Sequence, residues 1–170
     1  KGIKWSERKM QWEAPSGARL WMSYLDREDD VLRYQGLAFS WIGFDELTQW
    51  ATPYAWNYMR SRLRSVASDL PVYMRATTNP GGPGHQWVKK MFIDPAPYGR
   101  QFDATDIESG NILSYPKGHT KSGQPLFKRR FIPARLSDNP YLAETGDYET
   151  MLLSLPEHQR KQLLEGDWDI

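Results

Sequence analysis

The stretch Leu37-Ala38-Phe39-Ser40-Trp41-Ile42-Gly43-Phe44-Asp45-Glu46 decides how this chain is expected to fold. Its first part is almost wholly apolar and does not alternate, and two adjacent carboxylates end it. An apolar run of this length is typical of a strand buried on both faces, the kind that builds parallel α/β sheets. We therefore expect Asp45 and Glu46 at the carboxyl edge of a parallel sheet, where open α/β folds bind their ligands.

The sequence that follows continues an α/β pattern. After Thr48, apolar side chains recur at spacings of three and four, which predicts a helix that reaches Val66. Residues 72–76 predict a second short strand, and residues 85–93 predict a helix. Alternating strands and helices with short links favour a mostly parallel sheet with flanking helices.

The remaining segments carry weaker signals. Residues 10–13 and 19–24 flank a Pro-Ser-Gly turn, which predicts a β-hairpin. The acidic stretch 26–30 predicts a helix that ends near Gly36. Residues 94–124 are expected to form a loop with at most a short hairpin, residues 126–132 a strand, and the rest two closing helices.

Composition excludes several classes of protein. The 170 residues include 39% apolar and 14% aromatic residues, which argues against disorder. There is no Cys, so a disulfide framework, a cysteine zinc module and a thiol nucleophile are excluded. Because 22 Lys and Arg balance 21 Asp and Glu, any nucleic-acid contact must be a local patch. No stretch approaches the roughly 18 apolar residues of a membrane span, so no membrane partner is expected.

Two polar clusters are candidates for chemistry. One carboxylate of the pair Asp45 and Glu46 can hold Mg²⁺ while the other orients or deprotonates a water. Thr77, Thr78 and Asn79 follow the next strand, and would lie beside the carboxylates if the two strands are neighbours. Their hydroxyl and amide groups suit a γ-phosphate or a catalytic water. The alternatives are helix capping by the carboxylates and ordinary turn chemistry for the second cluster.

Taken together, these motifs resemble the large terminase subunit of tailed bacteriophages. The likeness lies in Trp41-Ile42-Gly43-Phe44-Asp45-Glu46 and in Arg75-Ala76-Thr77-Thr78-Asn79-Pro80-Gly81-Gly82-Pro83-Gly84-His85. It continues through Phe131-Ile132-Pro133-Ala134, Asp138-Asn139-Pro140-Tyr141-Leu142 and Leu164-Glu165-Gly166-Asp167-Trp168. The blocks follow the family's order over most of the chain.

The resemblance implies a fold and a set of roles. The family is a DNA-packaging motor with an ATPase domain of the P-loop, additional-strand catalytic-glutamate type, followed by an RNase H-like nuclease domain. By resemblance, Asp45 is the Walker B aspartate that organises Mg²⁺, and Glu46 is the catalytic glutamate that activates water. Thr77, Thr78 and Asn79 correspond to the coupling motif. The implied partners are double-stranded DNA, the portal protein and the small terminase subunit, in the cytoplasm of the bacterial host.

The sequence departs from that family in one decisive respect. A P-loop reads Gly-x-x-x-x-Gly-Lys-Ser/Thr, and no such motif is present. The run Gly118-His119-Thr120-Lys121-Ser122 has Thr120 where the second Gly must stand, and we reject it. Tight binding of ATP and Mg²⁺ by this chain alone is therefore not expected.

We interpret the chain as the carboxyl-terminal part of the ATPase domain, cut from something longer because Lys1 is not a natural start. The expected division is 1–93 for the Walker B and coupling core, 94–125 for a loop-rich segment, and 126–170 for a strand and closing helices. No nuclease domain is included.

Two further expectations follow. Without a P-loop strand, residues 72–76 should have an open edge that pairs with the missing half or with a second copy. Lys128, Arg129 and Arg130 form the best local basic patch for DNA or phosphate, although a solvated strand edge is the commoner explanation.

Two other functions remain open. One is a non-catalytic scaffold or prophage remnant that keeps the fold and binds no nucleotide. The other is a different additional-strand ATPase such as a helicase.

Overall fold

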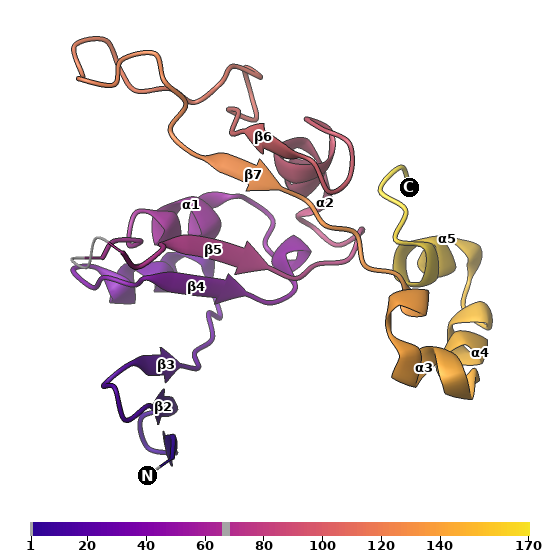
Figure 1. Cartoon of the computed structure of the whole chain (residues 1–170). Coiled ribbons are helices and arrows are strands. Elements are labelled where there is room, and N and C mark those ends of the chain that lie inside the picture. Colours follow the sequence, from indigo (N-terminus) through magenta and orange to yellow (C-terminus); the bar gives the residue numbers. More distant parts are fainter. Residues whose placement is uncertain (1, 66–68) are drawn as a thin grey trace.

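The computed structural model describes residues 2–65 and 69–170, and within them the strands form small separate sheets (Figure 1). Lys1 and Val66, which figured in the expectations above, lie outside the described residues. An antiparallel sheet joins β1 (Lys4–Ser6), β2 (Gln11–Glu13) and β3 (Arg19–Trp21). A parallel pair joins β4 (Trp41–Phe44) and β5 (Tyr73–Ala76), and an antiparallel pair joins β6 (Gln101–Asp103) and β7 (Lys128–Arg130).

The helices are short. The 3₁₀ helices are η1 (Glu28–Tyr34), η2 (Leu47–Gln49) and η4 (Leu136–Asp138). The α-helices α1 (Tyr54–Arg60), α3 (Pro140–Thr145) and α4 (Asp147–Leu153) each end without continuing into a π-helical turn. Helix α2 (His85–Val88) continues as the π-helical turn η3 (Lys89–Ile93), and α5 (Glu157–Arg160) continues as η5 (Lys161–Glu165).

The expected P-loop-type α/β fold, a mostly parallel sheet with flanking helices, is contradicted by this arrangement. Among the described residues, the only parallel pairing between named strands is that of β4 with β5. The other sheets are antiparallel, and each strand has only three or four residues. The structure is therefore only weakly α/β.

The apolar run at residues 37–44 does not form the expected strand buried on both faces. Only residues 41–44 of the run pair as a strand, and Trp41 is exposed while Ile42 is buried. A Cβ on Gly43 would lie 2.5 Å from Cη2 of Trp41, so the indole ring folds over the glycine on the outer face. The Trp41 ring thus covers the outer face of β4 at Gly43. The apolar residues of this strand therefore do not require a layer of helices on that face.

The inner face of the parallel pair packs on two hydrophobic clusters. One contains Val31, Ile42, Ala55 and Met59, which join η1 and α1 to β4. The other is formed from η2, α1, α2, η3 and the end of the chain, with the buried residues Leu47, Trp56, Trp87, Val88, Met91, Ile93 and Trp168. Phe44 and Met74 contact both clusters, so the parallel pair is the shared wall of the core.

Several local predictions are confirmed. β2 and β3 form the expected hairpin, and Gly17 has φ +86 in the turn between them. The helix after the acidic stretch ends before Gly36, and residues 85–93 are helical as expected. β1 and β6 were not anticipated, because three-residue strands leave too short a pattern to recognise.

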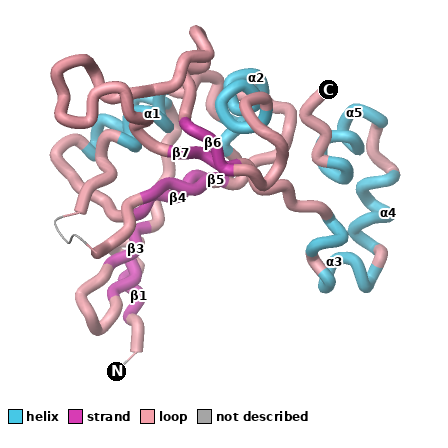
Figure 2. Tube along the Cα trace, turned by 45° about the horizontal axis from the view of Figure 1, so that its top comes forward, coloured by secondary structure: helices cyan, strands magenta, loops and turns pink. Residues whose placement is uncertain are grey.

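The carboxyl-terminal helices stand beside the sheets, joined by an extended segment after β7 (Figures 1 and 2). The last residues return to the core, where Trp168 is 3% exposed and stacks on His85. Lys89 Nζ donates a hydrogen bond of 2.5 Å to Asp169 Oδ1 next to this contact. The end of the chain is therefore held by an aromatic anchor and an ion pair.

The ion pair makes the docking of the chain end sensitive to pH. The bond from Lys89 lowers the pKa of the Asp169 carboxyl below its usual value. A depressed carboxyl pKa stabilises the folded state above the unfolded value of about 3.9 and loses that contribution as the pH falls further. We expect the amide protection factors of residues 165–170, which are corrected for the intrinsic exchange rate at each pH, to fall below about pH 4. The variant Asp169→Asn should lose this step, and an unchanged step in that variant would contradict the assignment.

Candidate functional site

The register of β4 and β5 brings the two predicted polar clusters together. Trp41 pairs with Tyr73 and Phe44 with Ala76, so both strands end at the same level. Asp45 is the residue after β4, and Thr77 is the residue after β5. The condition that the two strands are neighbours is therefore met, and Thr77 lies beside Asp45.

Backbone and side-chain bonds tie the two strand ends to each other. The Thr77 hydroxyl donates a hydrogen bond to Asp45 Oδ1. The Thr77 amide donates to the Phe44 carbonyl at 3.0 Å, and the Thr77 carbonyl accepts from the Leu47 amide at 2.9 Å. Asp45 and Thr77 are both exposed, so the bonded pair is accessible to a ligand.

Glu46 adopts an unusual backbone conformation. It lies in the left-handed region with φ 51 and ψ 55, and its amide donates to Thr77 Oγ1 at 3.4 Å. An L-residue in this region carries a strain of about 1–2 kcal/mol, and such strain clusters at functional sites. The turn directs Asp45 and Glu46 apart, because Asp45 lines a hollow beside β3 while Glu46 lines the groove beside β5.

Because of the strain at Glu46, we expect a glycine substitution at this position to be more stable than an alanine substitution, the reverse of the usual order in a helix. Glycine adopts positive φ without a steric cost, whereas alanine does not. We expect Glu46→Gly to be more stable than Glu46→Ala by about 1 kcal/mol, measured by urea unfolding. At Glu149, an exposed position in α4, the order should reverse, with glycine less stable than alanine by about 1 kcal/mol. Equal stability of the two variants at position 46 would mean that the turn is not strained.

Thr78 and Asn79 form hydrogen bonds with the buried Thr48, whereas the bond to Asp45 comes from Thr77. The Thr78 hydroxyl accepts from the Thr48 amide at 3.1 Å and bonds the Thr48 hydroxyl at 3.0 Å. Thr48 is 2% exposed, and its hydroxyl lies 3.0 Å from the Asn79 carbonyl. These bonds hold the segment after β5 against η2, the helical turn that follows Glu46 in the chain.

The glycine-rich turn after Asn79 packs closely on the same segment. A Cβ on Gly84 would lie 2.1 Å from the Trp50 carbonyl oxygen, so only glycine fits at this position. The Trp87 indole donates to that carbonyl at 2.7 Å. His85 Nδ1 accepts from the Gly81 amide at 2.8 Å, which makes His85 a part of the turn. Gly82 and Gly84 therefore pack on η2 and the residue after it, and the Gly81 amide is bonded within the turn.

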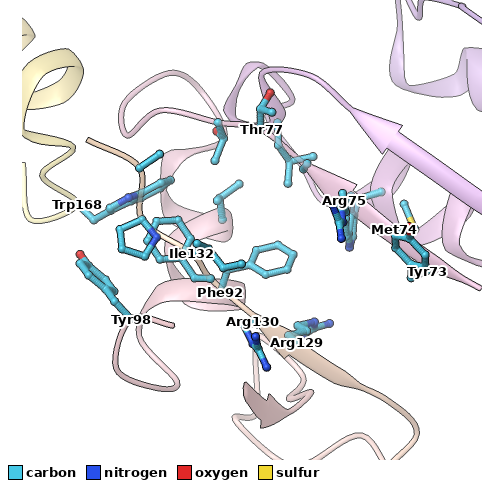
Figure 3. A pocket seen from close by; sticks show the side chains of 18 of the residues that line it. Tyr73, Met74, Arg75, Thr77, Phe92, Tyr98, Arg129, Arg130, Ile132 and Trp168 are labelled. Carbon is cyan, nitrogen blue, oxygen red and sulfur yellow. The ribbon is translucent and has the colours of Figure 1, made fainter. Parts of the chain in front are cut away.

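A groove of about 1470 Å³ lies between β5 and β7 (Figure 3). We call it the β5–β7 groove; its walls come from 72–80, 126–135, α1 and the chain end at 165–168. Thr77 and Trp168 lie toward one end, and Tyr73 and Arg129 toward the other (Figure 3). Within the described residues β5 pairs with β4 alone, so its second edge is open as expected.

The basic residues of β7 differ in exposure and in partners. Alternation along the strand leaves Lys128 and Arg130 exposed and Arg129 buried. Lys128 forms an ion pair of 3.3 Å with Asp103. Arg129 donates to the Thr105 carbonyl at 2.8 Å, and burial lowers the pKa of its guanidinium to about 10. Arg60 of α1, which the sequence did not single out, lies beside this arginine in the groove.

The donor set at Asp45 suits only a partly protein-bound cation. No group of three or more His, Asp and Glu side chains gathers anywhere in the described ranges. Mg²⁺ is commonly held by one or two carboxylates together with water and substrate phosphates. Asp45, with the Thr77 hydroxyl bonded to it, fits a Mg²⁺ that arrives with a phosphate ligand.

The chain has no significant match among protein-family models, curated proteins or solved structures. The resemblance to terminases rests on the sequence motifs, and the domain division and the assigned roles stay predictions. In the part of the chain that the structure describes, no helix is long and apolar enough to cross a bilayer.

Proposed function

We propose that this chain is part of an ATP-hydrolysing motor that packages double-stranded DNA into phage capsids. The observation that supports this proposal is the parallel register of β4 and β5, with the Thr77 hydroxyl bonded to Asp45. Asp45 after β4 and Thr77 after β5 form a suitable pair for holding a cation together with a phosphate. A portal protein, a small terminase subunit and the host cytoplasm are the surroundings that such a motor requires.

Each residue has a distinct part in the proposed reaction. Asp45 holds the cation, which when bound neutralises charge on the transferred phosphoryl group. Glu46, the next residue along the chain, is the proposed base that accepts a proton from the attacking water. Thr77 joins Asp45 to β5, so a change at the cation reaches the segment around Thr78 and Asn79. That segment is the proposed route from hydrolysis to DNA movement.

A non-catalytic scaffold is the second candidate, and one observation favours it. Gly82 and Gly84 pack on η2, and the sequence has no Gly-x-x-x-x-Gly-Lys-Ser/Thr motif to cradle phosphates. A motor therefore needs a phosphate-binding loop from another segment or partner. A scaffold needs none, and keeps the Asp45 to Thr77 bond only as a link between strands.

The experiment is Mg²⁺-dependent ATP hydrolysis by the full-length gene product that carries this sequence. We expect turnover that stops on removal of Mg²⁺ and falls by about a hundredfold or more in Asp45→Asn. Glu149→Gln, on exposed α4, is the control and should retain the wild-type rate. Absence of ATP binding and turnover in the full-length product would overturn the motor proposal and favour the scaffold.

A further inference from the structure

Two arginine side chains share one aromatic ring in the β5–β7 groove. The Arg60 Cζ lies 3.7 Å from the Phe127 ring centroid, and the Arg129 Cζ lies 5.3 Å from it. Arg129 is also 5.7 Å from the Phe92 ring centroid. The rings fix both guanidinium groups through cation–π contacts and hold two positive charges close together.

Neither arginine has an ion-pair partner in the described part of the chain, residues 2–65 and 69–170. Arg129 is also only 8% exposed. The Asp106 carboxylate opposes the charge of Arg129 without forming an ion pair with it, and its Oδ1 accepts from the Ser109 amide and hydroxyl, both at 2.8 Å. Burial of an unpaired charge is costly, and two like charges side by side add to that cost.

The groove as a whole is cationic around this pair. Six Lys and Arg residues line it against three Asp and Glu residues. The guanidinium of an arginine is a planar fork of donors that matches phosphate oxygens, and a phosphate carries nearly two negative charges. The arrangement is thus suited to a dianion that bridges both guanidinium groups.

We propose that Arg60 and Arg129 form a binding site for a small phosphate anion in the β5–β7 groove. Free inorganic phosphate, pyrophosphate and the phosphates of a soluble nucleotide share this chemistry. A DNA duplex does not fit, because the small exposed fraction of Arg129 keeps a rigid backbone away from it. The site requires neither hydrolysis nor the carboxylates, so it does not depend on the proposed motor function.

The site is also distinct in position from the strand ends at Asp45. Arg129 lies toward Tyr73 at the start of β5, and Thr77 follows its end (Figure 3). Four residues of extended chain span about 13 Å. A ligand at the arginine pair is therefore separated from the Asp45 carboxylate by most of the length of β5.

The test is calorimetric titration of the protein with pyrophosphate, inorganic phosphate and ATP in separate arms. We expect pyrophosphate to bind, with affinity reduced about tenfold to a hundredfold in Arg60→Met and in Arg129→Met. Arg8→Met, on an exposed turn outside the groove, is the matched control and should bind as the wild type does. The arm with the tightest binding identifies the source of the phosphate.

Thermal unfolding separates loss of the site from loss of the fold. Methionine keeps much of the stem packing and removes the unpaired charge, so both variants should remain folded without ligand. Pyrophosphate should raise the midpoint temperature of the wild type and not of either variant. Two results overturn the proposal: wild-type affinity in both folded variants, or no binding of any of the three probes to the wild type. ATP binding lost in Asp45→Asn but kept in Arg129→Met supports the motor site and counts against this one.

Discussion

Replacing Glu46 by glutamine is expected to lower kcat for ATP hydrolysis by roughly 10²- to 10⁴-fold in the full-length gene product. Glutamine has nearly the shape of glutamate but cannot take a proton from the attacking water. The Glu46 carboxylate lines the groove and makes no hydrogen bond or ion pair with another described residue, so the fold should be unchanged. The measurement is steady-state phosphate release with saturating Mg²⁺ and ATP.

The Glu46→Gln substitution should lower kcat and leave KM at its wild-type value. A group that acts on the water in the transition state changes kcat and kcat/KM together and leaves KM unchanged. Glu165→Gln is a suitable control, because Glu165 also lines the groove but lies in η5 near the end of the chain. A Glu46→Gln enzyme with normal kcat would show that Glu46 is not the base.

Truncation of Trp87 to alanine is expected to cost about 3–5 kcal/mol of unfolding free energy. The indole is 6% exposed within the larger hydrophobic cluster, and its N–H donates to the Trp50 carbonyl. The variant loses the packing of a large side chain and leaves a backbone oxygen without its partner. Urea unfolding measures the loss, and each kcal/mol should lower the thermal midpoint by about 2–4 °C in a chain of this size.

Two further variants separate packing from hydrogen bonding. Trp87→Phe keeps an aromatic ring and removes the N–H, so it should lose less stability than Trp87→Ala. Trp5→Ala serves as the control, because Trp5 is 41% exposed on β1 and should cost under about 1 kcal/mol. A loss at Trp87 no larger than at Trp5 would mean that the cluster does not depend on the indole.

Local patterns predicted the elements with a clear signal. The hairpin around Gly17, the helix at 85–93 and the strand at 72–76 all rest on turn residues or regular spacing within one segment. The three-residue strands β1 and β6 lack such a pattern, since their pairing depends on partners elsewhere in the chain. Sequence patterns identify an element only when the signal lies inside that element.

The predicted fold class, a mostly parallel sheet with flanking helices, was wrong. An apolar run indicates that a strand is buried, but it does not indicate which elements cover the strand. The outer face at Gly43 is covered by the indole of Trp41, a contact between neighbours on one strand. A run of the same composition in a wide parallel sheet is covered by helices instead. The amino-acid types are the same in both cases, so the number of parallel strands could not be deduced from them.

By itself, the sequence determined which groups stand at the two strand ends. Asp45 and Glu46 after one strand, and Thr77 after the next, follow from the order of residues and the direction of each strand. The absence of a Gly-x-x-x-x-Gly-Lys-Ser/Thr motif is likewise a property of the sequence alone.

Only the tertiary structure decided which side chains meet. The register places Thr77 against Asp45, the left-handed turn sends Glu46 into the groove, and packing around Phe127 joins Arg60 to Arg129. Arg60 and Arg129 are far apart in the chain, and no spacing links them. They share the Phe127 ring because both segments bury apolar surface against the same core, and this long-range packing leaves no local pattern in the sequence.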